Sequence, residues 1–271
     1  MVKKRLERFI YHRLDQVPIA SVYAKSRGWY FVIAWVHRFC GILMVLFVSV
    51  HIYTLSFLLA PALYDAKMKF FSLSLFSFLS WILAIPVTFH ALNGGRLILY
   101  EIFGSRNDGA MIRWVFFLSI AYVFLQGLLM ILWSRPVPVL FFWLIAATIS
   151  SSLTGLVISR SLKATGSIFW KLHRITGSFL LIMVPAHLMF MHLQPGISQE
   201  AAMVIARIQN AFIKWVDLGM LFAILYHGGY GLISITGDYI KSKALHNSVA
   251  AFIFMTMAAF GWIGIRLTIM I

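Results

Sequence analysis

Two segments of the chain carry histidines with a repeated spacing. Residues 37–51 read HRFCGILMVLFVSVH and residues 173–187 read HRITGSFLLIMVPAH, so a His-Arg pair opens each segment and a histidine closes it. Further along, HALNGGRLILYE begins at His90 and HGGYGLISITGDY begins at His227. The offset is 136 residues for the first motif and 137 for the second. This repeat predicts two related halves, each with two histidine-bearing segments.

Four of these histidines, His51, His90, His187 and His227, stand in apolar stretches. A single histidine there could simply join two helices by a hydrogen bond, but two in each half at matching positions favour ligation. Imidazole binds iron, copper and zinc, and zinc or copper usually recruits cysteine, methionine or carboxylate as well. Haem iron needs only two facing histidines and an apolar slot. The four histidines therefore predict two bis-histidine haem sites.

The composition indicates which solvent surrounds these segments. The chain has 271 residues, of which 61% are hydrophobic and 11% are charged, and its mean hydropathy is +0.89. A soluble domain has about 25% charged residues, so this chain cannot cover its surface in water. The single cysteine, Cys40, excludes an intrachain disulfide. A bilayer is the solvent that fits this composition, and a polar side chain inside a bilayer marks function by default.

Seven apolar stretches are long enough to cross about 30 Å of hydrocarbon as helices. A lone strand would leave its backbone unpaired in lipid, so the expected fold class is an all-α transmembrane bundle of about seven helices with an internal duplication. The prolines of SRPVP, residues 134–138, predict a tight turn between the third and fourth helices. The stretches lie near residues 30–59, 71–103, 112–133, 137–159, 168–193, 212–237 and 246–270.

The repeat divides the chain into four segments. Residues 1–28 are a basic arm that lacks the apolar core of a signal peptide. Residues 29–135 form the first half and residues 168–271 the second, each with three helices. Residues 136–167 add one crossing and a linker. Each half has three helices, so without an extra crossing the second half would be inverted relative to the first in the membrane. The extra crossing gives four crossings between the first helices of the two halves, and the halves then share one orientation.

The net charge of +15 is distributed unevenly. With the N-terminus in the cytoplasm, most lysines and arginines fall on the cytoplasmic side, as the positive-inside rule requires. The opposite loops hold few: Lys67, Lys69, Arg135, Arg207 and Lys214. The asymmetry accounts for the charge without a nucleic acid, and none is expected as a partner. We expect a multi-pass protein of the inner (cytoplasmic) membrane of a prokaryote.

The depth of each histidine predicts the pairing. At about 1.5 Å per residue, His51 and His187 lie roughly 28–32 Å from the cytoplasmic rim, and His90 and His227 lie roughly 15–20 Å from it. His51 is therefore expected to pair with His187 at an outer haem. His90 is expected to pair with His227 at an inner haem, so that each haem lies between the two halves.

Each HRxxG motif sets a His-Arg pair closer to the cytoplasmic rim. His37 with Arg38, and His173 with Arg174, lie at a level expected to be too shallow for a third buried haem. Cations at this level suit haem propionates or a quinone headgroup. Arginines there also snorkel to lipid phosphate. The four residues are candidates for cofactor binding, with snorkelling as the alternative for the arginines.

These motifs resemble the membrane-anchor cytochrome b of succinate dehydrogenases and fumarate reductases. The HRxxG motifs, the HxxxG helices and the pair Asp238-Tyr239 carry the resemblance, which covers about residues 29–103 and 168–271 and leaves the stretch near 112–160 poorly matched. Anchors of this family commonly come as two three-helix chains, so this chain resembles a fusion of both.

The resemblance also implies the cofactors. Single-haem members take both ligands at the positions of His90 and His227, and dihaem members add ligands at those of His51 and His187. The chain thus resembles the dihaem type with two haems b, which the family usually couples to menaquinone.

The resemblance to the family's ubiquinone pocket is partial. Arg38 and Tyr239 match it, but Ala34 stands where a serine is usual, one turn before that arginine. Dihaem relatives place an acidic residue near the outer haem in the first outer loop. Asp65 in APALYDAKMK is the candidate here, with a solvated loop carboxylate as the alternative. Menaquinone is therefore favoured over ubiquinone.

The function that the resemblance implies is an electron-transfer anchor. It would connect a cytoplasmic iron-sulfur subunit with membrane quinone and hold a flavoprotein subunit at the membrane. The chain has no CxxC cluster and no GxGxxG fingerprint, so it carries no dicarboxylate or flavin chemistry itself. One alternative is a cytochrome b of a hydrogenase, formate dehydrogenase or nitrate reductase. The other is a transporter that relays protons through histidines. Such a transporter would need carboxylates inside the membrane, and the one candidate, Asp217, is expected near a helix end.

Overall fold

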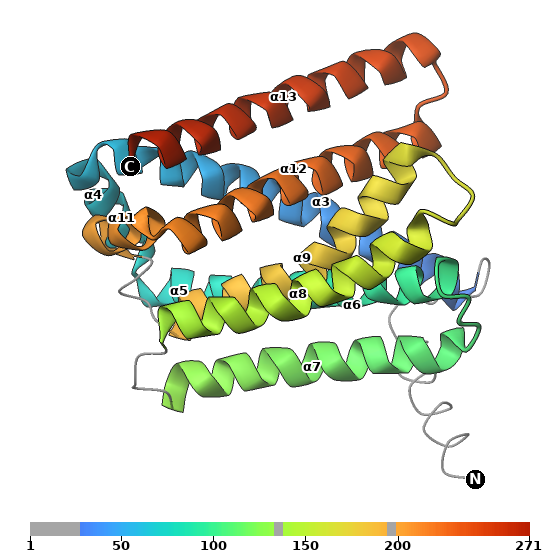
Figure 1. Cartoon of the computed structure of the whole chain (residues 1–271), viewed down its shortest axis with the longest axis horizontal. Coiled ribbons are helices and arrows are strands. Elements are labelled where there is room, and N and C mark those ends of the chain that lie inside the picture. Colours follow the sequence, from blue (N-terminus) through green and yellow to red (C-terminus); the bar gives the residue numbers. More distant parts are fainter. Residues whose placement is uncertain (1–27, 133–137, 194–198) are drawn as a thin grey trace.

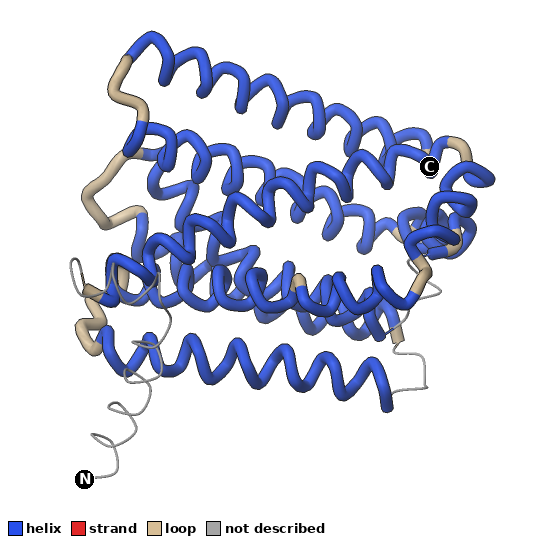
Figure 2. The backbone as a smooth tube through the Cα atoms, turned by 180° about the vertical axis from the view of Figure 1, so that it is seen from behind, coloured by secondary structure: helices blue, strands red, loops and turns tan. Residues whose placement is uncertain are grey.

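The computed structural model describes residues 28–132, 138–193 and 199–271, which form a bundle of long helices (Figure 1). Within these residues seven helical segments are long and apolar enough to cross a membrane, as predicted: Trp29–Leu59, Leu75–Glu101, Asp108–Leu132, Val139–Ser161, Ile168–Leu193, Ala211–Tyr239 and Lys243–Met270. The described part of the chain contains no strand (Figure 2). The basic arm and most of the SRPVP turn lie outside the described residues.

The two halves contain corresponding helices. The first half is built from α3 (Trp29–Leu55), the 3-10 turn η1 (Ser56–Leu59), α4 (Pro61–Phe71), α5 (Ser74–Ile82), α6 (Ala84–Glu101) and α7 (Asp108–Leu132). The second half is built from α9 (Ile168–Leu193), α11 (Ala201–Gln209), α12 (Ala211–Tyr239) and α13 (Lys243–Met270). Between them lies α8 (Val139–Ser161), the extra crossing.

The four histidine-bearing helices pack together at the centre of the bundle. In the first half α3 contacts α6, and in the second α9 contacts α12. The halves meet through α6 against α9 and α12 against α3. The remaining long helices cover this core, with α7 on α6, α13 on α12 and α8 on α9 (Figure 1). The same set of contacts therefore occurs twice, and α8 is the element without a counterpart.

Proline divides the stretch that was expected to be one helix near residues 71–103. A turn at Leu83 separates α5 from α6. Pro86 has no N–H and cannot donate to the carbonyl of Ile82, so the regular hydrogen-bond ladder is interrupted there. The expected single helix is therefore two segments that make one crossing. Residues 71–73 belong to the end of α4 and the turn after it.

The helices that bear His51 and His187 each contain, two residues earlier, a residue type that can disturb a regular helix. In α9 this is Pro185, whose carbonyl accepts a 2.5 Å hydrogen bond from the hydroxyl of Tyr122 in α7. In α3 it is Ser49, whose hydroxyl donates to the carbonyl of Val45 at 2.8 Å. Proline lacks the N–H that a regular helix uses, and a serine that bonds back to a carbonyl often bends a helix.

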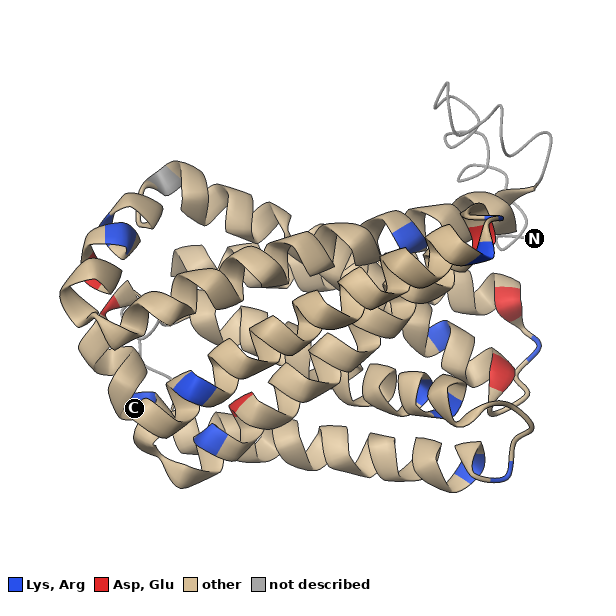
Figure 3. Cartoon of the chain, turned by 90° about the horizontal axis from the view of Figure 1, so that it is seen from above, with Lys and Arg blue, Asp and Glu red and all other residues tan. Residues whose placement is uncertain are grey.

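The bundle has two chemically different ends. At the basic end α3, α7, α9 and α13 begin and α6, α8 and α12 finish; at the short-helix end lie α4 and α11 (Figure 1). Most charged residues lie toward these ends (Figure 3). The surface between them is apolar; on α7, for example, Ile120 and Ile131 are 69% and 83% exposed. Such a belt is what a membrane-spanning surface presents to lipid.

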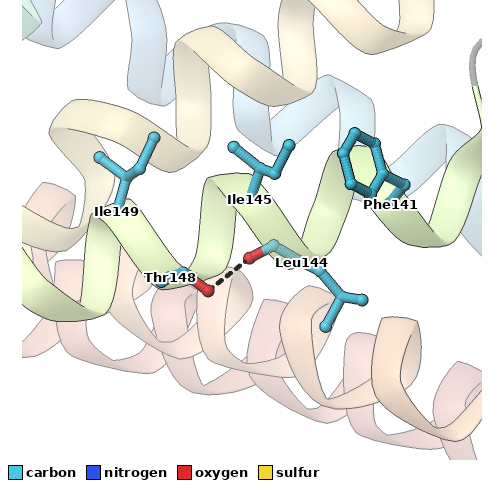
Figure 4. A pocket seen from close by; sticks show the side chains of 5 residues that line it. All are labelled: Phe141, Leu144, Ile145, Thr148 and Ile149. Atoms are coloured by element: carbon cyan, nitrogen blue, oxygen red, sulfur yellow. Dashed lines mark hydrogen bonds between the residues drawn. The ribbon is translucent and has the colours of Figure 1, made fainter.

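A shallow groove on the exposed face of α8 is also mostly apolar. Its lining is Phe141, Leu144, Ile145, Thr148 and Ile149 (Figure 4). The one hydroxyl there, on Thr148, donates to the carbonyl of Leu144 at 2.7 Å. The groove therefore offers no free polar or titratable group for chemistry.

Candidate functional site

Four histidines, one from each central helix, form a cluster in the half of the core nearer the basic end. His37 stacks on His90 with ring centroids 4.0 Å apart, and His173 stacks on His227 at 4.1 Å. The rings of His90 and His227 face each other across the two halves, with centroids 6.2 Å apart and an interplanar angle of 87°. We call these four residues the stacked cluster.

The separate, shallower level expected for His37 and His173 is not observed. Because α3 begins at Trp29, His37 lies about 12 Å into its helix, while His90 lies about 16 Å from the end of α6, at 1.5 Å per residue. The two depths differ by less than the rise of one helical turn, and the side chains are long enough to span that difference. The rings are in contact, so the four histidines occupy one level.

The backbone orients the two facing rings. His90 Nδ1 lies 3.0 Å from the carbonyl oxygen of His37, and His227 Nδ1 lies 3.2 Å from that of His173. A carbonyl only accepts, so in each case Nδ1–H is the donor and Nε2 keeps its lone pair. This is the arrangement typical of a metal-ligating histidine, in which the second nitrogen is held by a hydrogen bond.

The glycines of the two HRxxG motifs make room for the same rings. A Cβ added at Gly41 would lie 3.0 Å from Cε1 of His90, and one at Gly177 would lie 3.0 Å from Cε1 of His227. The glycines of the HxxxG motifs, Gly94 and Gly231, are less crowded, because a Cβ added there would come no closer than 3.8 Å to another side chain. The tight contact therefore comes from the facing helix and not from the histidine's own helix.

Two ion pairs join the halves reciprocally at the basic end. Arg38 of the first half donates to Asp238 of the second at 2.6 Å. Arg174 of the second half donates to both carboxylate oxygens of Glu101 of the first, at 2.7 and 3.0 Å. The side chain of Arg174 is 18% exposed and that of Arg38 is 40% exposed. Arg174 also lies 3.3 Å from Nδ1 of His173, so it is the arginine more closely tied to the cluster.

The two candidates for quinone binding besides Arg38 lie apart from the stacked cluster. Tyr239 ends α12 and is 58% exposed. Asp65, in α4, accepts a 2.7 Å hydrogen bond from the backbone N–H of Ala201 at the start of α11. It thereby satisfies one of the free N–H groups of that helix. Its carboxylate has a structural partner, which a solvated loop residue would not have.

A second pair of histidines lies nearer the short-helix end. The ring centroids of His51 in α3 and His187 in α9 are 6.1 Å apart, with an interplanar angle of 76°. We call them the edge-on pair. The ring of Trp143, a fully buried residue of α8, lies 6.0 Å from that of His187. Nδ1 of His187 is buried and has no hydrogen-bond partner within the described ranges.

The spacing of both facing pairs would allow the two imidazoles of each pair to share one metal ion. With metal–nitrogen bonds of about 2.0 Å and a ring centre about 1.1 Å behind each nitrogen, the centroids would be about 6.2 Å apart. The observed distances are 6.1 and 6.2 Å. In the described part of the chain no group of three or more His, Cys, Asp or Glu could hold an ion by itself, as a zinc site needs. Each pair offers the two histidines that a bis-histidine haem iron would need.

One further polar contact had no interpretation from the sequence. Arg207 of α11 lies 3.3 Å from the carboxylate of Asp217 in α12, and its side chain is only 10% exposed. From the sequence, Arg207 counts as a loop charge and Asp217 as an isolated acid near a helix end. The opposite charges ten residues apart, on two segments joined at Asn210, are the signal that could have linked them.

Comparison with known families supports the two-half organisation. The family model for the succinate dehydrogenase/fumarate reductase transmembrane subunit matches the chain twice, over residues 18–126 and 158–265. The first match extends to residue 126, inside α7, beyond the part that the motifs alone had covered. Comparisons with curated proteins and with solved structures find no match. The two matched ranges leave out residues 127–157, which include the end of α7 and most of α8.

Proposed function

We propose, because this chain belongs to the transmembrane-subunit family of succinate dehydrogenases and fumarate reductases, that it is a dihaem cytochrome b anchor. Membership makes it a membrane anchor associated with the catalytic subunits of such an enzyme. The observation that carries the dihaem proposal is the presence of two cross-half histidine pairs at 6.1 and 6.2 Å. His90 and His227 would hold the inner haem, and His51 and His187 the outer one.

When bound, each haem supplies a one-electron carrier whose potential depends on its ligands and surroundings. The residues of the chain do the rest. The carbonyls of His37 and His173 hold Nδ1–H of the inner ligands and leave Nε2 available for iron. The four proposed ligand histidines are all partly buried within the bundle. Arg38 and Arg174 place positive charge near the inner level, where haem propionates or a quinone headgroup carry negative charge or acceptor oxygens.

The basic end is proposed to face the cytoplasm and the iron-sulfur subunit, which in turn binds the flavoprotein subunit. Electrons would pass between that subunit and menaquinone in the inner membrane of a prokaryote. The chain itself has no dicarboxylate chemistry. The family match favours this function over a cytochrome b of a hydrogenase or formate dehydrogenase. The pairing of Asp217 with Arg207 disfavours a proton-relay transporter, because that carboxylate already has a cation.

Haem content and the optical spectrum of the purified chain test the proposal. We expect a reduced-minus-oxidised α band of b type, and two haems b per chain by the pyridine haemochrome method. One haem per chain would contradict the dihaem proposal while leaving the anchor intact. No haem at all would contradict the cytochrome function.

A further inference from the structure

A buried arginine at the short-helix end has more hydrogen-bonding capacity than its surroundings use. Arg207 lies in α11, which is held in place at its start by Asp65 and by a cluster of buried residues including Leu58, Tyr64 and Val204. The side chain of Arg207 is 10% exposed. It therefore lies within the bundle and does not extend freely to water or to lipid phosphate.

The residues around Arg207 provide partners for only some of the N–H donors of its guanidinium. Nη2 lies 3.3 Å from Asp217, whereas Nε and Nη1 are buried and have no hydrogen-bond partner in the described ranges. Leaving buried donors of a charged group without partners is costly, and a single ion pair at this distance does not offset that cost. A further acceptor is the expected remedy.

The position of Arg207 indicates where that acceptor lies. Leu55, one helical turn after His51, packs in the same buried cluster as Ile205 and Ile208, which flank Arg207. Phe190, three residues after His187, belongs to the same buried cluster as Val216, the neighbour of Asp217. Arg207 and Asp217 therefore lie on segments that pack beside the helices of both members of the edge-on pair. Burial raises the pKa of Tyr64 to about 12, so its hydroxyl is neutral and offers no negative charge to the arginine. Of the groups named here, only Asp217 is an anion paired with Arg207.

The cation belongs to only one half of the chain. Asp65 and Ala201 are 136 residues apart, as the halves are, and the same offset places Phe71 opposite Arg207. The first half therefore has an apolar residue where the second has a buried arginine. The arginine is therefore not inherited from the duplication. Its presence in one half only is consistent with a single anionic group bound beside the edge-on pair.

We propose that Arg207 binds a propionate carboxylate of the haem held between His51 and His187, and that Asp217 positions the guanidinium for it. This inference rests on the proposed function, which supplies that haem. Guanidinium is the side chain best matched to a carboxylate, and the propionate provides the acceptor oxygens that Nε and Nη1 lack. Arg207 is thus a positioning and charge-setting residue for the outer haem alone.

Redox titration of both haems, in membranes containing the full chain with its partner subunits, tests this role. Arg207→Gln should lower the midpoint potential of the outer haem, because losing a nearby cation destabilises the more electron-rich ferrous state. The inner haem should be unchanged. Arg207→Lys should restore most of the potential, and Asp217→Asn should raise it. Arg266→Gln, which removes an exposed arginine of α13 at the same end, is the matched control and should change neither haem.

The outcomes separate this inference from the proposed function. Loss of the outer haem alone in Arg207→Gln, restored in Arg207→Lys, would also support it. Two bound haems with an unchanged outer potential would overturn it, as would loss of both haems in both variants. A change confined to the KM for quinone would assign Arg207 to quinone and overturn it too. An unmodified chain without a second haem would refute the dihaem proposal itself, and this inference with it.

Discussion

The stacked cluster and the edge-on pair contain facing histidines at nearly the same separation, yet their surroundings differ. In the stacked cluster a carbonyl holds Nδ1 of both facing rings, and a neighbouring histidine stacks on each. In the edge-on pair Nδ1 of His187 has no partner within the described ranges, and the neighbouring aromatic rings are those of Trp143 beside His187 and of Phe47 stacked on His51. Cross-half ion pairs lie near the first, and one incompletely paired arginine lies near the second.

This difference indicates that the two pairs of histidines are oriented in different ways. At the stacked cluster backbone carbonyls fix the tautomer and orientation of the two facing rings, while Nδ1 of His37 has no hydrogen-bond partner within the described ranges. At the edge-on pair several polar groups remain without partners, so the bound cofactor is expected to complete the site. Changes to the protein scaffold should therefore affect the inner site most, and changes to charge beside the cofactor should be most selective at the outer site.

The largest effect is expected from adding bulk at the glycines that touch the facing rings. Gly41→Val or Gly177→Val places a side chain where even a Cβ would lie 3.0 Å from a ligand ring. Because His90 or His227 must then move, we expect loss of the inner haem with the outer haem retained, measured by redox-resolved spectra. Gly155→Val in α8, where a Cβ meets nothing within 4 Å, is the control. A normal inner haem in both glycine variants would show that the packing is not needed.

A smaller effect is expected from the arginines at the basic end. Arg174→Leu should lower the midpoint potential of the inner haem, because a cation that favours the ferrous state is removed. Arg38→Leu should lower it less, since that side chain is more exposed and its charge more screened. Neither variant should shift the outer haem. Unchanged inner potentials, together with normal reduction by the iron-sulfur partner, would leave both arginines as residues that only join the halves or contact lipid.

The smallest effect is expected at Asp65, where a structural role and a quinone role make different predictions. If its carboxylate serves only α11, Asp65→Asn should keep the contact to Ala201 and leave quinone turnover unchanged, because asparagine also caps helices well. Asp65→Ala should lower the free energy of unfolding by about 1 kcal/mol, the usual effect of losing a helix cap. Thermal unfolding and quinone reduction rates distinguish the two roles. A large loss of turnover in Asp65→Asn with normal stability would establish the quinone role.

The parts of the fold and site that could be predicted depend on periodicity and chain length. Hydropathy indicates the seven crossings, and counting residues along the helices leads to the facing pairs His51–His187 and His90–His227. Contacts between helices are less accessible, because they depend on rotation and tilt. Thus the stacking of His37 on His90 and the contact of Gly41 with the same ring were not foreseen.

The partners of the charged residues are also hard to predict from the sequence, because they depend on how the helices pack. Glu101 and Asp238 are separated by the 137-residue offset of their motif, so their equivalence is visible in the sequence. Their exchange of arginine partners between halves is a property of the assembled bundle. Arg207 has no counterpart in the repeat, and only its burial beside Asp217 distinguishes it from an ordinary loop cation.

Redox titration of four single variants, His51→Ala, His90→Ala, His187→Ala and His227→Ala, tests most directly whether two haems are held between the halves. We expect two classes. His90→Ala and His227→Ala should lose the same redox component, and His51→Ala and His187→Ala should lose the other, with one haem remaining per chain in each variant. If His51→Ala and His90→Ala abolish the same component, or if all four variants keep two haems, the assignment of ligands to these two pairs is contradicted.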